Sequence, residues 1–475
     1  MKNRIIFFDV ALLVAGVIVI LLIASSALGW TWTARLGSLV VVWPNRLRHI
    51  LFAALALVIV TRILLSPSHR IPFATSGARR TFASSRFVNR WLLGGIVGLL
   101  TVAISLRTFK LSYFRNIPYY ELHYDMARWV LERPLERLPL IVVPGHEWGG
   151  IRAGYFRPIA VLTYLVDLVW GAAPAGVLMF NVVLYSILAV QVGFLAWRLT
   201  EDSRVVWAAT LLFALFPLRS EMLLEIAHRD EILYSLFYLC ALIAFIDFGR
   251  TQDRGKLVWA LGAFLLAILS KEQGFSFPIL LGFYAAASSI GTWSSRLKRV
   301  FVITTPYLAI ALLLMLYRVA AQGSFVGGHH AAPWLFRRLV TLGSLVFYGL
   351  VYPIPLTVIP PSTPRLLAVA LLSTPLLFLL WTRSFDWRLA FLLGAVPISA
   401  SVSSTIIELT ETGQTVWYFT LPSAFFSIAL AASVLVLPAK KVRRSLSLPL
   451  LTLYVALYAT ILSLSQGMLV MDAAR

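Results

Sequence analysis

The chain has 475 residues, of which 60% are hydrophobic and only 13% are charged, and its formal net charge is +21. A soluble domain of this length could not bury so much apolar surface, so the composition excludes an ordinary water-soluble enzyme and indicates the lipid bilayer as solvent. A basic excess in a membrane protein is typical of cytoplasmic loops, so we expect contact with membrane lipids and no nucleic acid partner. The single cysteine, Cys240, excludes an intramolecular disulfide.

Apolar runs long enough for membrane-crossing helices recur along nearly the whole chain, which predicts an all-α polytopic membrane protein. The first run is longer than the core of a cleavable signal, so we interpret it as a retained anchor. About thirteen transmembrane helices are expected, near residues 6–29, 48–64, 91–107, 176–198, 205–218, 231–247, 257–270, 275–291, 300–319, 366–382, 389–403, 418–437 and 447–470.

These helices are expected to form three parts. Residues 1–90 would hold two extra N-terminal helices and a basic cytoplasmic loop. Residues 91–437 would form the core, which includes a long outer loop at 108–156. Residues 438–475 would add a second basic loop and the final helix.

The distribution of Lys and Arg predicts how the chain is oriented. Two further apolar stretches, 157–170 and 336–353, would spoil the alternation of sides, so we expect them to lie as interfacial or half-membrane helices on the outer side. With the N-terminus in the cytoplasm, every strongly basic short loop then falls inside, as the positive-inside rule requires. These inner loops are 65–90, 248–256, 292–299, 383–388 and 440–444.

The same alternation gathers polar clusters on the outer face. Glu121 and Asp125, in the long outer loop, stand four residues apart and would share one face of a helix. Arg157 precedes a proline at the expected start of a helix. Two more clusters follow, "FPLRSEMLLEIAHRDEIL" with Glu221, Arg229 and Glu231, and "LSKEQG" with Lys271 and Glu272.

A combination of carboxylates and cations at one membrane surface suits group transfer from a lipid-linked phosphate. A carboxylate can act as the general base toward an acceptor hydroxyl, while arginine and lysine hold phosphate and stabilise its charge as it leaves. Each group also has a structural interpretation: the loop acids as a solvated helix face, Arg157 as a headgroup anchor, and the other charges as ion pairs that pin helices together.

In order along the chain, these motifs resemble the membrane half of the transmembrane-and-tetratricopeptide O-mannosyltransferases. More broadly, they resemble the GT-C superfamily of polyprenol-dependent glycosyltransferases. The stretch "VWYFTLPS" at 416–423 is similar to a later motif of that family. The other matching positions are Arg157 and Pro158, then Pro217, Glu221, Arg229 and Glu231, then Ser270 to Gly274.

The resemblance implies a GT-C-like helical bundle whose first outer loop carries the catalytic acid. It implies transfer of a sugar, with mannose as the candidate, from a polyprenyl phosphate to a hydroxyl of an exported protein, lipid or glycan in one inverting displacement. Glu121 or Asp125 would be the base. Donor phosphate would be bound by Arg157, Arg229 and Lys271, and these cations would be oriented by Glu221, Glu231 and Glu272.

The chain departs from the family pattern at several points. Glu231 stands where the family has aspartate, and Trp417 stands where it has arginine. The tetratricopeptide half is not part of this sequence, so we expect a bacterial-type enzyme in the inner membrane, with its active site on the outer side.

These residues single out no cofactor; a divalent metal stays open as an alternative but is not indicated. His146 with Glu147, and His329 with His330, do not have the spacing of a closed zinc site. Two other functions remain open at this stage, a lipid-linked sugar transporter and a catalytically silent scaffold derived from such an enzyme.

Overall fold

The computed structural model describes residues 33–36, 39–42, 129–143, 147–148, 151–152, 156–169, 174–216, 228–289, 292–322, 387–402 and 416–435. Most of these residues are helical, as the sequence predicts. Two small antiparallel hairpins were not expected: β1 (Thr33–Leu36) with β2 (Leu39–Val42), and β3 (Glu147–Trp148) with β4 (Ile151–Arg152). Five of the predicted transmembrane helices, and the short helix predicted at 336–353, lie outside the described residues, so the count of thirteen stays a prediction.

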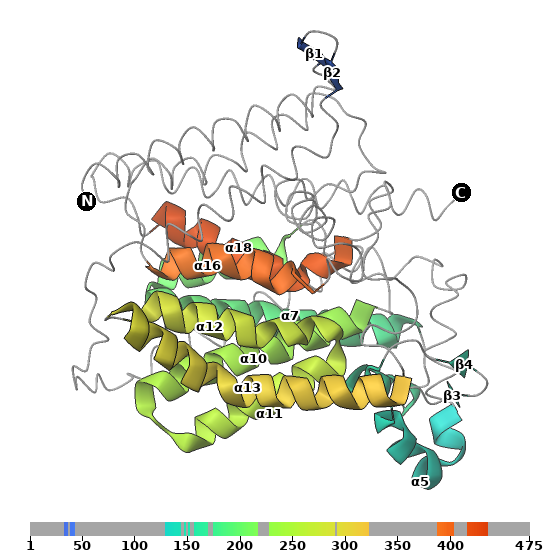
Figure 1. The fold of residues 1–475 in the computed structure, drawn as a ribbon. Helices are drawn as coiled ribbons and strands as arrows, with labels where there is room; N and C mark the ends of the chain where they lie inside the picture. The colour runs from blue at the N-terminus through green and yellow to red at the C-terminus, as the bar shows by residue number, and fades with distance from the viewer. Residues whose placement is uncertain are drawn as a thin grey trace, which may run out of the picture.

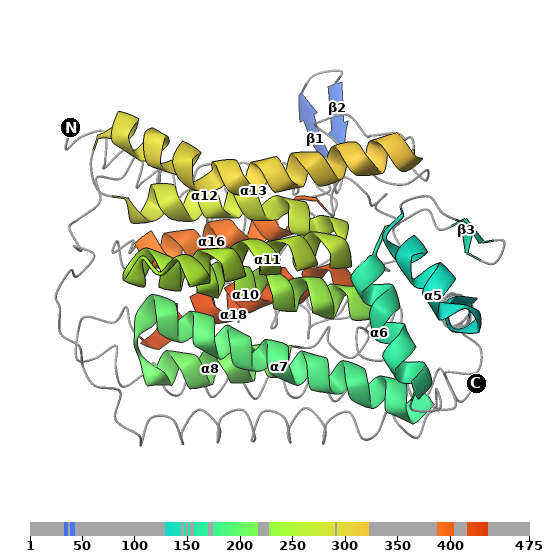
Figure 2. The ribbon, with the colours of Figure 1, turned by 90° about the horizontal axis from the view of Figure 1, so that it is seen from below.

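The described helices form a bundle of roughly parallel rods (Figures 1 and 2). Near one end of the bundle, α6 runs across the ends of the long helices (Figure 2). The helices are α5 (Pro134–Arg137), η3 (Leu138–Val142), α6 (Pro158–Val169), α7 (Pro174–Thr200), α8 (Ser203–Ala214), α10 (Arg229–Thr251), α11 (Arg254–Ser270), η5 (Glu272–Ser276), α12 (Phe277–Ser288), α13 (Trp293–Gln322), α16 (Trp387–Ala400), η7 (Val416–Phe419) and α18 (Thr420–Leu435).

Among the described residues, three helices are long and apolar enough to cross a membrane: Met179–Thr200, Arg229–Thr251 and Trp293–Ala320. They coincide with the predicted helices at 176–198, 231–247 and 300–319. Along α13, large apolar side chains such as Phe301 and Leu313 are 70% and 67% exposed. An exposed apolar surface of this kind fits contact with lipid tails, because water would not tolerate it.

The core contains interlocking aromatic rings. Phe277 of α12 lies 5.2 Å from Phe264 of α11 and 5.4 Å from Tyr307 of α13, between ring centroids. Phe245 of α10 packs edge-on against Tyr284 of α12 and Tyr307. Edge-to-face contacts of this type favour one relative placement of the helices, so the ends of the bundle are held in register.

Short turns join neighbouring helices and set their order. Gln252 ends α10 in the left-handed conformation, with φ of 56°, and the Asp253 side chain accepts a hydrogen bond from the Gly255 amide at 2.9 Å to start α11. This turn brings Arg250 and Arg254 to the same end of the bundle as the start of α13, which carries Lys298 and Arg299. The predicted inner loops 248–256 and 292–299 therefore share one end, which we call the basic end.

Candidate functional site

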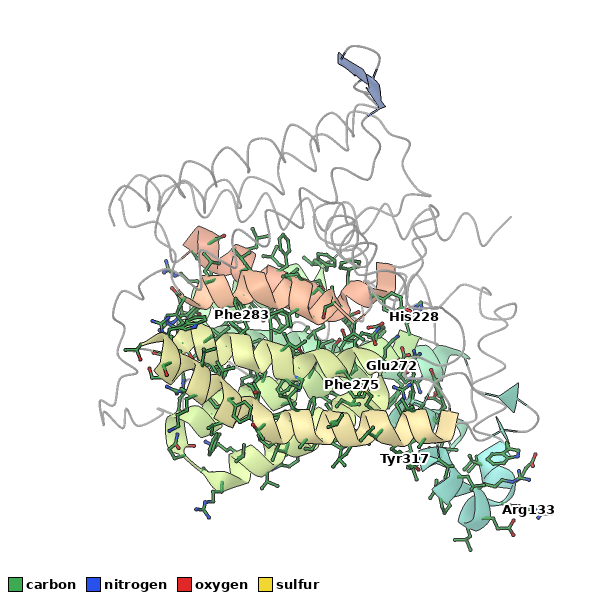
Figure 3. The ribbon with its side chains drawn as sticks, viewed as in Figure 1. Arg133, His228, Glu272, Phe275, Phe283 and Tyr317 are labelled. Atoms are coloured by element: carbon green, nitrogen blue, oxygen red, sulfur yellow. The ribbon has the colours of Figure 1, made fainter. Side chains whose placement is uncertain are left out.

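The opposite end of the bundle holds most of the sequence-predicted site residues. Arg157 directly precedes α6, and Glu231 lies in the first turn of α10 beside Asp230. Lys271 ends α11 in an extended conformation, with φ of −162° and ψ of 150°, and Glu272 begins the 3₁₀ turn η5. Four separate elements thus bring their charged ends to one place. Figure 3 shows Glu272 and His228, the N-cap of α10, at this end, and Phe283 toward the other end.

Close packing of the backbone shapes the "SKEQG" turn. A Cβ atom on Gly274 would lie 2.8 Å from the Ile268 amide nitrogen and 2.9 Å from the Ala267 carbonyl carbon. Contacts this short with backbone atoms cannot be relieved by a rotamer change. Glycine therefore lets η5 fold back onto the last turn of α11, which directs Lys271 and Glu272 into the bundle.

These residues form one network of ion pairs. Arg157 donates from Nη1 to Asp230 and from Nη2 to Glu272 Oε2, the latter at 2.9 Å. The Lys271 Nζ atom lies 3.0 Å from Asp230 Oδ1 and 2.7 Å from Glu231 Oε1. The predicted pairing of Arg157 and Lys271 with carboxylates therefore has a geometric basis, although Asp230 was not assigned to the site from the sequence.

A further cation completes the network from α13. Arg318 donates from Nη2 to Glu272 Oε1 at 2.8 Å, so Glu272 bridges two arginines. The Arg318 side chain is 1% exposed, and within the described part of the chain its Nε and Nη1 atoms have no hydrogen-bond partner. Three cations thus face three carboxylates in a buried cluster. The Arg157 side chain, at 19%, is the most exposed of the six.

Proximity of opposite charges keeps the turn residues ionised. Burial alone would raise the pKa of Glu272, but the charges of Arg157 and Arg318 outweigh it and hold that pKa well below its ordinary value. Burial alone would lower the pKa of Lys271, yet its two carboxylate partners on α10 raise it. The Lys271 ammonium and the Glu272 carboxylate therefore both stay charged near neutral pH.

An aromatic residue from the C-terminal part of the core reaches the same cluster. The Lys271 Nζ atom lies 5.1 Å from the centre of the Tyr418 ring, a cation–π distance. Tyr418 belongs to η7, within the motif-like stretch 416–423. Sequence segments that resembled a family pattern in order along the chain thus meet in space.

Arg229 lies apart from this network. Its guanidinium is completely buried, donates to Asn181 at 2.7 Å and to Asp167 at 2.6 Å, and is flanked by the ring of Tyr164 at 4.7 Å. These partners belong to α6 and α7, so Arg229 ties three helices together. The contacts favour the helix-pinning interpretation over the predicted role in binding phosphate.

Part of the long outer loop also packs at this end. Val130 and Ile141 form a small buried cluster with Val161 of α6. The Tyr317 hydroxyl of α13 donates to the Val142 carbonyl oxygen at 3.0 Å. The segment 129–143 is therefore anchored beside the first turn of α6 and the last turns of α13, where Arg157 and Arg318 lie.

Three predicted site residues, Glu121, Asp125 and Glu221, lie outside the described residues. Among the residues that the sequence analysis missed, Arg318 carried a usable signal, because a charge near the end of a long apolar helix is costly unless it is paired. No group of three or more metal-ligating side chains occurs within the described segments.

Known proteins share part of this sequence. A stretch of 144 residues is 29% identical to Protein O-mannosyl-transferase Tmtc1 of Drosophila melanogaster, and covers 30% of the chain and 17% of that protein. A stretch of 128 residues is 32% identical to Protein O-mannosyl-transferase TMTC3 of Mus musculus, and covers 25% of the chain and 13% of that protein. The chain is similar to protein O-mannosyl-transferases.

A third relative is also a protein O-mannosyl-transferase. Protein O-mannosyl-transferase TMTC4 of Homo sapiens is 29% identical over 141 residues, which is 25% of the chain and 19% of the relative. The matches to these O-mannosyl-transferases thus span less than a fifth of each relative's own length. No protein-family model matches the chain. The resemblance to the transmembrane-and-tetratricopeptide O-mannosyltransferases, inferred from the motifs, is confirmed by these relatives.

Proposed function

We propose that the chain is a membrane glycosyltransferase that moves a sugar, with mannose as the candidate, from a polyprenyl phosphate to a hydroxyl of an exported acceptor. The observation that carries this proposal is the buried network at one end of the bundle, which combines Arg157, Lys271 and Arg318 with three carboxylates. The similarity to protein O-mannosyl-transferases supports the reaction class.

The cations would bind the donor phosphate. Their positions are held by Asp230, Glu231 and Glu272, so little reorganisation is needed when a lipid-linked phosphate arrives. Arg157 is the most exposed member and would meet the phosphate first. Arg318 supplies a cation in a chain that has Trp417 where the family has arginine.

The base would come from the outer loop, as Glu121 or Asp125. Asp125 precedes Trp129 by four residues, so their Cα atoms are at most about 14 Å apart. Trp129 packs against the buried cluster of Val130, Ile141 and Val161. Val161 of α6 follows Arg157 by one helical turn. The proposal therefore requires this short tether to bring a carboxylate to the phosphate-binding cations.

The proposed reaction is a single displacement. A loop carboxylate takes the proton of the acceptor hydroxyl, whose oxygen attacks the anomeric carbon from the face opposite the phosphate. The bond between that carbon and the phosphate oxygen breaks, and the electron pair leaves with the polyprenyl phosphate. The configuration inverts, and the negative charge that grows on the phosphate is stabilised by Arg157, Lys271 and Arg318.

The orientation that suits this reaction places the basic end in the cytoplasm and the network on the outer side of the inner membrane. Arg250, Arg254, Lys298 and Arg299 at the basic end fit the positive-inside rule. The donor lipid would then enter sideways from the outer leaflet, and no metal takes part in the proposed steps.

A transfer assay with the full chain in lipid nanodiscs tests the proposal. The probes are mannosyl phosphoryl undecaprenol for donor binding and, in cells, radiolabelled mannose followed into exported proteins, lipids and glycans. We expect Glu121→Gln with Asp125→Asn to lower turnover by about 100-fold or more while donor binding persists. The control is Glu132→Gln in the same loop, whose side chain is 66% exposed.

Each other outcome has a defined meaning. Intact turnover in the double variant would disprove the assignment of the base. Donor binding without turnover, accompanied by movement of the donor between leaflets, would indicate the transporter. Absence of both binding and turnover would indicate the silent scaffold.

A further inference from the structure

A pocket lies at the basic end, away from the charge network. It is a cavity of about 420 Å³ between α10, α12 and α13. Its inner wall is apolar and includes Phe245, Ile246 and Ile303, and its rim carries Lys298 and Arg299. This volume lies in the range of small-molecule binding sites. Nothing in the proposed sugar transfer uses it.

The rim of this pocket is strongly positive. Lys298 and Arg299 are exposed, and neither forms an ion pair within the described part of the chain. Gly249 of α10 also lines the pocket, and Arg250 follows it in the last turn of that helix. None of the described lining residues is acidic. The pocket therefore complements an anion.

The wall of the pocket suits a hydrocarbon chain. Val302 lines the pocket and is also 63% exposed on the apolar surface of α13, beside Phe301. Gly249 of α10 also lines it, and a Cβ atom there would meet nothing within 4 Å. The pocket thus has free space next to a surface where lipid tails would lie.

We propose that this pocket binds one anionic phospholipid of the leaflet at the basic end. The phosphate sits between Lys298 and Arg299, and part of an acyl chain lies against Phe245, Ile246 and Ile303. Basic pockets between membrane helices attract anionic headgroups, and an apolar wall adds the selectivity for a lipid over a soluble phosphate. The bound lipid would join α10, α12 and α13 at their ends and so stabilise the bundle.

Native mass spectrometry of the full chain with added phosphatidylglycerol or phosphatidylcholine measures this binding. We expect the wild type to retain phosphatidylglycerol preferentially. Lys298→Gln with Arg299→Gln should weaken its binding by about 30-fold, given the usual contribution of two cations at an anionic surface. The matched control is Arg254→Gln with Lys256→Gln, which removes an exposed and a half-buried cation at the same end, neither of which lines the pocket.

A second pair of variants tests the apolar wall without changing any charge. Gly249→Leu should fill the pocket and lower phosphatidylglycerol retention. Gly262→Leu on α11 is the control, because its Cβ also meets nothing within 4 Å and Gly262 does not line the pocket. Thermal unfolding with and without phosphatidylglycerol should show a stabilising shift in both controls that is lost in both pocket variants.

Several results would overturn the proposal. Equal loss of binding in the two double variants would mean that only the general charge of this end matters. Equal retention of the two lipids, or an equal stabilising shift from glycerol 1-phosphate, would exclude a lipid-selective site. Because none of these measurements involves sugar transfer, failure here leaves the proposed glycosyltransferase activity untouched.

Discussion

Glu272 is the residue on which the charge network most depends. It accepts hydrogen bonds from both Arg157 and Arg318 and is almost completely buried. In Glu272→Gln, Arg157 keeps its bond to Asp230, but Arg318 becomes a buried cation without a described counter-ion. Removing one partner of a buried ion pair costs about 3–5 kcal/mol of the free energy of unfolding, and we expect about 3 because the glutamine oxygen can still accept one bond.

The assay is equilibrium unfolding of the purified chain in mixed detergent micelles. The control is Glu201→Gln at the basic end, whose carboxylate lies 3.5 Å from Arg250 and whose side chain is 66% exposed, so its loss should cost less than about 1 kcal/mol.

A double variant isolates the buried pair. Glu272→Gln with Arg318→Met removes both charges, so it should recover about 2 kcal/mol relative to the sum of the single changes. Strict additivity, or a Glu272→Gln cost no larger than that of Glu201→Gln, would refute the idea that Glu272 neutralises buried arginines.

Three further predictions concern the same end of the bundle. The pKa of Glu272 is depressed in the folded protein, so the Glu272 charge stabilises the fold at pH values above 4.5, the ordinary pKa of this side chain. The free energy of unfolding, measured at each pH, should therefore fall as the pH drops below 4.5 in the wild type and fall less in Glu272→Gln. Asp167→Asn should cost about 3 kcal/mol by leaving Arg229 without its carboxylate, and adding Arg229→Met should recover part of that loss in the same assay; no recovery would argue against a buried pair. Gly274→Ala should destabilise by about 1–3 kcal/mol because of its backbone contacts, whereas Gly249→Ala, in an open helical position, should stabilise slightly; the opposite order would refute the packing argument.

Sequence patterns predicted the helices well where they were long. The runs at 176–198, 231–247 and 300–319 correspond to α7, α10 and α13, because sustained apolar character reports burial in lipid directly. For short apolar runs, the predicted helix bounds were less exact. The predicted helix at 205–218 is a 12-residue helix, Ser203–Ala214, and the one at 275–291 begins as the 3₁₀ turn η5 before α12. Apolar composition alone does not show where helical hydrogen bonding ends.

The site was predictable only as a set of charges at one end. Periodicity and charge alternation brought Arg157, Lys271 and Glu272 to the same side. They could not tell which carboxylate meets which cation, because partners such as Arg157 and Glu272 are 115 residues apart. The different surroundings of Arg229 and Asp230, neighbours in sequence, follow from the helical twist that points successive side chains to different faces.

The proposed function requires the charge network to face the outer side of the membrane, and labelling of single cysteines tests this orientation. In a Cys240→Ala background, Leu135→Cys places a thiol at a 93% exposed position of the loop that packs beside the network, and Arg254→Cys places one at the basic end. We predict that a membrane-impermeant maleimide labels Leu135→Cys in intact spheroplasts and labels Arg254→Cys only after permeabilisation. Labelling in the reverse pattern would place the network on the cytoplasmic side and exclude sugar transfer at the outer face.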